Sequence, residues 1–224
     1  MEQTDRNMTI RNHWLLERSI LFKKYAVNMP ERADKIDLTL DYPDCGWIDM
    51  HFYVNGEEKV VIDTSYVYEP FLDIKEWLEN IVSHIFDFTP TGVNIYNECY
   101  NFLLYYEPLF IQTDDQMTPN PQELYGLFYV YDGHKGKVVT DALCETKEFV
   151  RCIYQKILDF ALSARENEDF IDDWCWYAYN EECGTMWENN DPEIKNIFVN
   201  KVSSELIEKF LSDEDSTRRF IQIK

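Results

Sequence analysis

The stretch "WIDMHFYVNGEEKVVIDTSYV" at residues 47–67 decides the fold class. Its first half alternates between apolar and other side chains, which predicts a half-buried strand. The face expected to be buried carries Ile48, Met50, Phe52 and Val54. Asn55 and Gly56 follow, and both tolerate the positive φ angles of a two-residue hairpin turn. Residues 58–67 then predict the return strand of an antiparallel pair.

The chain on both sides of this hairpin extends the pattern. Residues 35–42 alternate again and predict another strand, with Ile36, Leu38, Leu40 and Tyr42 on one face. Residues 72–86 change to helical spacing, and Asp73 lies near the expected helix N-terminus. The apolar stripe of this helix is Ile74, Trp77, Leu78, Ile81 and Ile85. We expect the helix containing Trp77 to cover the apolar face of the hairpin.

Later segments repeat these two kinds of element. Strands are predicted at residues 92–97, 100–107, 124–132 and 137–143. Helices are predicted at residues 9–27, from a capping Thr146 to about residue 161, and as one helix from Pro192 through residue 210, with Asp191 as its N-cap. Helices packed on a mostly antiparallel sheet built from hairpins make an α+β domain. We expect a single domain over residues 1–224, with a possible weak boundary at the polar loop 112–122.

The charge of the chain is strongly acidic and unevenly distributed. The 224 residues include 42 acids against 21 lysines and arginines, a formal net charge of −21. Residues 166–194 contain ten of the acids and no lysine or arginine. A negative field repels phosphate backbones, so direct binding of DNA or RNA is not expected. A basic protein partner or a cation fits the charge, and so does simple solubility.

Cysteine use and hydropathy indicate a reducing compartment. None of the six cysteines forms a CxxC pair, so zinc-knuckle and redox spacings are absent. The first residues, "MEQTDRNMTIRNHW", lack the apolar region of a signal peptide. No stretch reaches the ~20 apolar residues of a membrane span. We expect a cytoplasmic protein with free thiols and no membrane association.

Three segments resemble, in their order, a loose family of small bacterial proteins. They are "DTSYVYEPFLDIKEWLENIV" (63–82), "NFLLYYEP" (101–108) and "KEFVRCIYQKILDFALSA" (147–164). Members of this family are mostly uncharacterised, and some are similar to immunity proteins of toxin systems. The resemblance covers roughly residues 35–165 and carries no catalytic signature. It implies an interaction protein more than an enzyme, and it assigns no functional residue.

Motifs of common catalytic sites are missing. Neither glycine-rich phosphate loop occurs, and there is no GxSxG or HExxH. The histidines are scattered singly, and we interpret each as a surface or hydrogen-bonded side chain: His13, His51, His84 and His134. Cys183 lies among acids, which raise a thiol pKa, so it is not expected to be a nucleophile.

The acidic segment 166–194 is the candidate functional region. Asp169, Asp172 and Asp173 would share a face of a helix, where three carboxylates could hold Mg²⁺ or Ca²⁺, with Glu181 and Glu182 as further ligands. That arrangement is the alternative hypothesis, a metal-dependent hydrolase. Carboxylate runs are more often solvated faces, so no metal and no cofactor is predicted.

Binding of a basic partner accounts for more of the segment. Interfaces place aromatic rings at the centre and charges at the rim. The predicted contact residues are Asp169, Asp172, Asp173, Trp174, Trp176, Glu181, Glu182, Trp187 and Glu188. The leading hypothesis is a non-enzymatic protein-binding module that neutralises a basic partner such as a toxin domain. A scaffold whose tryptophans only anchor the segment to the core is the third hypothesis.

Overall fold

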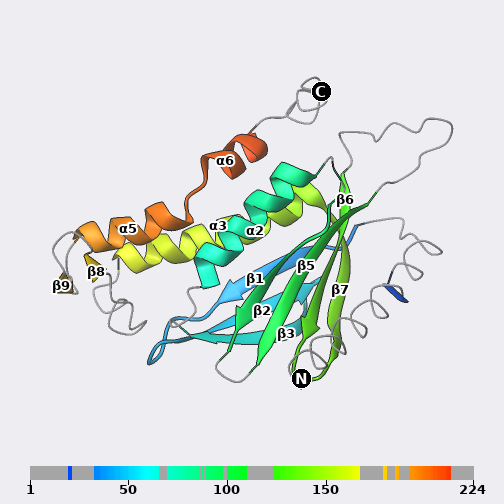
Figure 1. The fold of residues 1–224 in the computed structure, drawn as a ribbon, viewed down its shortest axis with the longest axis horizontal. Helices are drawn as coiled ribbons and strands as arrows, with labels where there is room; N and C mark the ends of the chain where they lie inside the picture. Colours follow the sequence, from blue (N-terminus) through cyan, green and yellow to red (C-terminus); the bar gives the residue numbers. More distant parts are fainter. Residues whose placement is uncertain are drawn as a thin grey trace, which may run out of the picture.

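The computed structural model describes residues 20–21, 33–65, 70–85, 87, 89–97, 100–109, 124–166, 179–180, 185–186 and 192–212. Strands and helices follow one another in two blocks, and the long helices lie together on one side of the strands (Figure 1). The first block is β1 (Ile36–Leu40), β2 (Trp47–Val54), β3 (Glu57–Ser65) and α2 (Pro70–His84). The second is β4 (Thr91–Tyr96), β5 (Asn101–Leu109), β6 (Tyr125–Asp132), β7 (Lys137–Glu145) and α3 (Thr146–Glu166). The two-residue strands β8 (Tyr179–Asn180) and β9 (Thr185–Met186) pair with each other, and α5 (Pro192–Val202) and α6 (Glu205–Ser212) complete the order.

The predicted hairpin at Asn55-Gly56 is confirmed. β2 and β3 pair antiparallel, and the turn residues have φ angles of 54° and 81°. Between β1 and β2, Cys45 and Gly46 have φ angles of 50° and 82°, and Asp44 and Trp47 bridge across them. The two turns make β1-β2-β3 a continuous antiparallel meander. Tyr42, predicted on the buried face, lies beyond β1 and is 50% exposed.

The strands form two antiparallel sheets where one was predicted. β1-β2-β3 make the first and β4-β5-β6-β7 the second, while the predicted antiparallel α+β class is confirmed. Alternation along a strand identifies the buried face, but it does not say which hairpins share one hydrogen-bonded ladder. The sheets are joined at Asp34, whose N–H donates to Leu143 O at 2.7 Å and whose carboxylate accepts from Leu143 N–H at 3.0 Å.

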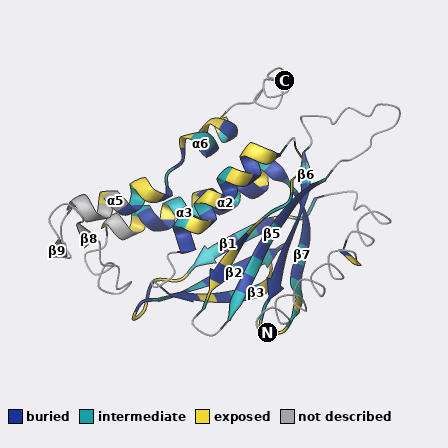
Figure 2. Cartoon of the chain, viewed as in Figure 1, coloured by how far each residue is buried: buried dark blue, intermediate teal, exposed yellow. Residues whose placement is uncertain are grey.

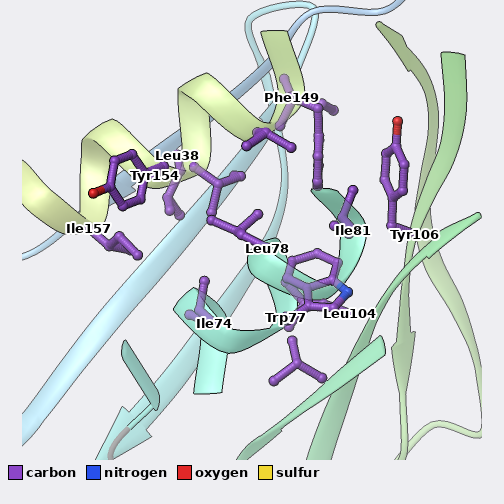
Figure 3. Close-up of a cluster of buried hydrophobic side chains, with 14 of the residues drawn as sticks. Leu38, Ile74, Trp77, Leu78, Ile81, Leu104, Tyr106, Phe149, Tyr154 and Ile157 are labelled. Atoms are coloured by element: carbon purple, nitrogen blue, oxygen red, sulfur yellow. The ribbon is translucent and has the colours of Figure 1, made fainter. Parts of the chain in front are cut away.

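A shared aromatic core holds the helices to both sheets. The ring of Phe128 on β6 lies 5.8 Å from Phe52 on β2, 6.5 Å from Trp77 on α2 and 5.1 Å from Phe149 on α3. Trp77 is only 2% exposed and points toward Leu104 on β5 (Figure 3). The helices turn buried faces to the sheets and exposed faces outward (Figure 2). Trp77 is therefore a core residue, as predicted, and Phe128 connects it to the β2–β3 hairpin.

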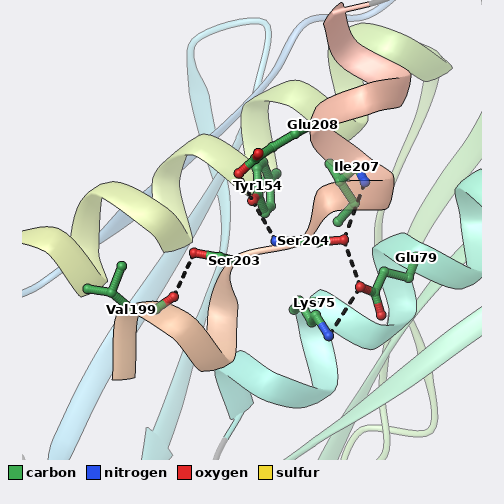
Figure 4. Close-up of polar contacts among 8 residues, drawn as sticks. All are labelled: Lys75, Glu79, Tyr154, Val199, Ser203, Ser204, Ile207 and Glu208. Atoms are coloured by element: carbon green, nitrogen blue, oxygen red, sulfur yellow. Dashed lines mark hydrogen bonds and ion pairs between the residues drawn. The ribbon is translucent and has the colours of Figure 1, made fainter. Parts of the chain in front are cut away.

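The predicted last helix is broken into two, α5 and α6. Ser203 N–H donates to Val199 O at 3.0 Å and ends α5, while Ser204 accepts the N–H groups of Ile207 and Glu208 and caps α6. Ser204 is buried, and its own N–H donates to Tyr154 Oη at 2.9 Å (Figure 4). The apolar spacing alone did not reveal the break, since Phe198, Val202 and Phe210 are all buried on both sides of it.

The second sheet also buries part of its other face. A second apolar cluster lies there, formed by Leu21, Leu127, Tyr129 and Leu143. Leu21 is one of two described helical residues, 20 and 21. The rest of the predicted helix 9–27 and the loop 112–122 lie outside the described residues. Among the described helices, none is long and apolar enough to cross a membrane. The single domain stays a prediction.

Candidate functional site

The acid-aromatic residues predicted to form a site all lie outside the described residues. They are Asp169, Asp172, Asp173, Trp174, Trp176, Glu181, Glu182, Trp187 and Glu188. The same holds for Cys183. The partner-binding and metal-binding hypotheses for segment 166–194 therefore stay predictions.

The outer face of the first sheet gathers acids and aromatic rings. Burial alternates along β2, with Ile48, Met50, Phe52 and Val54 buried and the residues between them only partly buried. We call the following set the outer face: Asp41, Trp47, Asp49, His51, Tyr53, Glu58 and Asp63. Pairing of Asp49 with Asp63 and of Tyr53 with Glu58 places β2 and β3 side chains together on it.

Three aspartates form a row across the three strands. Asp41 N–H donates to Asp49 O at 3.0 Å, which continues the β1–β2 register one residue beyond β1, and Asp49 lies opposite Asp63. A hydrogen bond with the carboxyl of Asp63, followed by burial and the negative charge of Asp63, raises the pKa of Asp49. Like charges directly opposite each other in a sheet are destabilising. When both are ionised, the Asp49–Asp63 pair therefore costs stability locally.

His51 lies beside this row with a carboxylate at each ring nitrogen. Its Nδ1 is 2.9 Å from Glu58 Oε2, and its Nε2 is 3.4 Å from Asp41 Oδ2. Tyr53 donates to the same Glu58 oxygen at 3.3 Å. Burial has the largest effect on the pKa of His51 and lowers it, but the hydrogen bond to Glu58 and the negative charges of Asp41 and Glu58 together outweigh it and leave the pKa raised.

The histidine and two of the aspartates could hold a metal ion. One ligand atom each from Asp41, Asp49 and His51 lie within 4.8 Å of one another. Among the described residues, these three form the one group of metal-ligating side chains that lie this close together. None of the three had been singled out as a site residue, and His51 had been interpreted as an ordinary surface or hydrogen-bonded histidine.

A signal for this face was present in the sequence. Residues 33–65 contain eight acids and two lysines, a balance of −6. The positions between the predicted core residues of β2 carry Trp47, Asp49, His51 and Tyr53. The alternation therefore predicted which side chains share the outer face. It did not predict that Asp41 and Asp63 lie on either side of Asp49, because that follows from the two strand registers.

A groove of about 620 Å³ lies between β1 and α3. Both cations that α3 contributes to it are paired, since Lys156 Nζ is 3.4 Å from Asp37 and Arg151 pairs with Glu148. Burial and then the charge of Asp37 raise the pKa of the Cys152 thiol to about 11. The thiol is therefore protonated at neutral pH and a poor nucleophile, so the groove is a weaker candidate than the outer face.

Comparison of the chain with protein-family models, with curated proteins and with solved structures finds no match.

Proposed function

We propose that the protein is a non-enzymatic binding module that docks a basic protein partner on the outer face of its first sheet. The observation that carries this proposal is the row of Asp41, Asp49 and Asp63, with Glu58 beside it, on a surface of the folded chain. Negative charges placed together attract a positive surface over a distance and accelerate encounter.

Aromatic side chains on the same face supply contact area. Trp47 and Tyr53 are both partly buried and lie at either end of the β2 positions that face outward. Tryptophan and tyrosine are enriched among the residues that dominate binding energy at interfaces. The face therefore combines rings with carboxylates, and the two rings flank the row of aspartates.

The negative charge of the outer face favours a module that neutralises its basic partner. A protein that acts on nucleic acids needs a cationic site for phosphate, and clustered carboxylates complement such a site. The resemblance to immunity proteins points the same way. The proposal includes a cytoplasmic location, which is supported by the free thiols of Cys144 and Cys152.

A pull-down with three purified baits tests the proposal. The first bait is wild type, the second carries Asp41→Asn, Glu58→Gln and Asp63→Asn, and the third carries the matched exposed changes Asp159→Asn, Glu166→Gln and Glu205→Gln on the helices. We expect wild type and the helix variant to retain the same basic protein and the outer-face variant to release it. The association rate of that protein with wild type should fall as salt rises.

A fourth bait separates the two acidic regions. It carries amides at Asp169, Asp172, Asp173, Glu181 and Glu182 and leaves the outer face intact. Release from this bait alone would move the docking site to segment 166–194. Recovery of the same proteins by every bait would overturn the proposal, because neither acidic region would then select a partner.

A further inference from the structure

His51 presents one ring nitrogen to a place where two carboxylates converge. Its Nε2 is fully buried and makes no hydrogen bond within the described part of the chain, although the side chain as a whole keeps 20% exposure. The nearest charged atom is Asp41 Oδ2 at 3.4 Å, and an Asp49 carboxylate oxygen completes the group within 4.8 Å. We propose that Asp41, Asp49 and His51 form a binding site for a divalent transition-metal ion such as Zn²⁺.

The hydrogen bond at the other ring nitrogen orients His51 for this role. A carboxylate only accepts hydrogen bonds, so in the neutral ring the proton is on Nδ1 and is donated to Glu58 Oε2 at 2.9 Å. Nε2 then carries the free lone pair and faces Asp41. Metal-binding histidines almost always donate their other N–H to a carboxylate, a carbonyl or a water, which sets the tautomer and the ring orientation.

Glu58 is itself held in place. Tyr53 Oη donates to the same Oε2 atom at 3.3 Å, and Tyr53 and Glu58 are directly paired between β2 and β3. Tyr53 therefore fixes the position of Glu58, and Glu58 in turn fixes the orientation of the His51 imidazole. Each member is on a strand, which positions a ligand more rigidly than a loop does.

The spacing of the ligand atoms suits a small ion. Ligands bound tetrahedrally at roughly 2.0–2.1 Å lie about 3.4 Å apart, and His51 Nε2 and Asp41 Oδ2 are separated by 3.4 Å. The Asp49 oxygen lies within 4.8 Å of both atoms. Three protein ligands leave the remaining position of a tetrahedral site to water.

The ligand types select the class of ion. Imidazole suits zinc, copper, iron and nickel, whereas Mg²⁺ and Ca²⁺ prefer sites made of oxygen alone. Two carboxylates cancel the charge of a divalent ion, and Asp63 beside Asp49 adds to the attraction. The site is complete within one chain, so the proposal stands or fails independently of the docking function.

Metal titration of the full-length protein after removal of metals with a chelator tests the site. We expect Zn²⁺ to bind one equivalent by calorimetry, and Co²⁺ to give a visible absorption spectrum of an oxygen–nitrogen site. Thiolate ligation by a cysteine would instead add charge-transfer absorption in the near ultraviolet. His51→Gln and Asp49→Asn should each abolish this equivalent, and Glu58→Gln should weaken it by about 10–100-fold.

His84 provides the matched control. Its Nδ1 is 3.6 Å from Asp87, so it too is a histidine beside an aspartate, but the described residues place no second ligating carboxylate with it. His84→Gln should leave the binding unchanged. Absence of one-equivalent binding in wild type, persistence of that binding in His51→Gln, its loss in His84→Gln, or a thiolate spectrum would each overturn the proposal. Circular dichroism of every variant shows that the sheet is retained.

Discussion

Two polar clusters in this protein are built in opposite ways. Between the helices, Tyr154, Ser204, Glu79 and Lys75 form a closed network in which donors meet acceptors: Ser204 Oγ donates to Glu79 at 2.7 Å, and Lys75 pairs with Glu79 at 3.1 Å (Figure 4). On the outer face of the first sheet, carboxylates lie opposite carboxylates. The first cluster stabilises the fold, because buried polar groups are tolerated when they are paired. The second cluster costs stability, and residues that break a local rule in this way are expected at functional sites.

The largest expected difference in stability is between substitutions of two tryptophans, one in the core and one on the outer face. Trp77→Ala should lower the free energy of unfolding by about 3–5 kcal/mol, because it empties a fully buried position against Phe128 and Phe149. Trp47→Ala on the outer face should cost clearly less. Urea unfolding of both variants measures the difference. Equal costs would mean that the outer face contributes to the core.

The helix network is tested next by Tyr154→Phe. The hydroxyl accepts Ser204 N–H and donates to Glu208 at 3.1 Å, so its removal leaves a buried N–H without a partner. We expect a loss of about 1–3 kcal/mol, measured by urea unfolding. Burial above all raises the pKa of Tyr154 to about 12, so the hydroxyl remains a donor across the usual pH range. A neutral result would contradict a stabilising role for the network.

Asp132 is a carboxylate that the fold does pair, and its effect should depend on pH. Burial acts to raise its pKa, but the N–H groups of His134 and Lys135 and the Lys135 ammonium outweigh burial and lower it below 3.8. Its stabilisation is therefore complete above this value and is lost as pH falls through the lowered folded-state pKa. Asp132→Asn should cost about 1–2 kcal/mol at neutral pH. Thermal unfolding across pH should show this cost shrinking in acid, and a cost that stays constant with pH would contradict the pairing.

The smallest expected effect has the opposite sign. Asp63→Asn removes one of two carboxylates that face each other, so with chelator present it should stabilise the protein by roughly 0.2–1 kcal/mol. A hydrogen bond with Asp63, then burial and the charge of Asp63, raise the pKa of Asp49, so the repulsion disappears as acid protonates Asp49. The gain should therefore be greatest at neutral pH and fade as pH falls. A loss of stability at neutral pH would show that the pair is a structural contact.

Local periodicity was sufficient for the elements whose partners are near in sequence. Asn55-Gly56 predicted its hairpin because both residues tolerate positive φ, and the stripe around Trp77 predicted α2 because burial follows the helical repeat. The break before α6 escaped prediction, since Ser204 is held by Tyr154, fifty residues away.

The sequence by itself determined the acidic balance, the alternating strands and the two sides of β2, because each depends only on residue type and spacing. Tertiary structure alone decided that the strands split into two sheets. It also decided that four side chains lie close together on the outer face: Asp41, Asp49, Asp63 and His51. Those residues are distributed over 23 positions of the chain, from Asp41 to Asp63. Strand register brings them together, and register is set by two turns and a buried face that act on the whole meander.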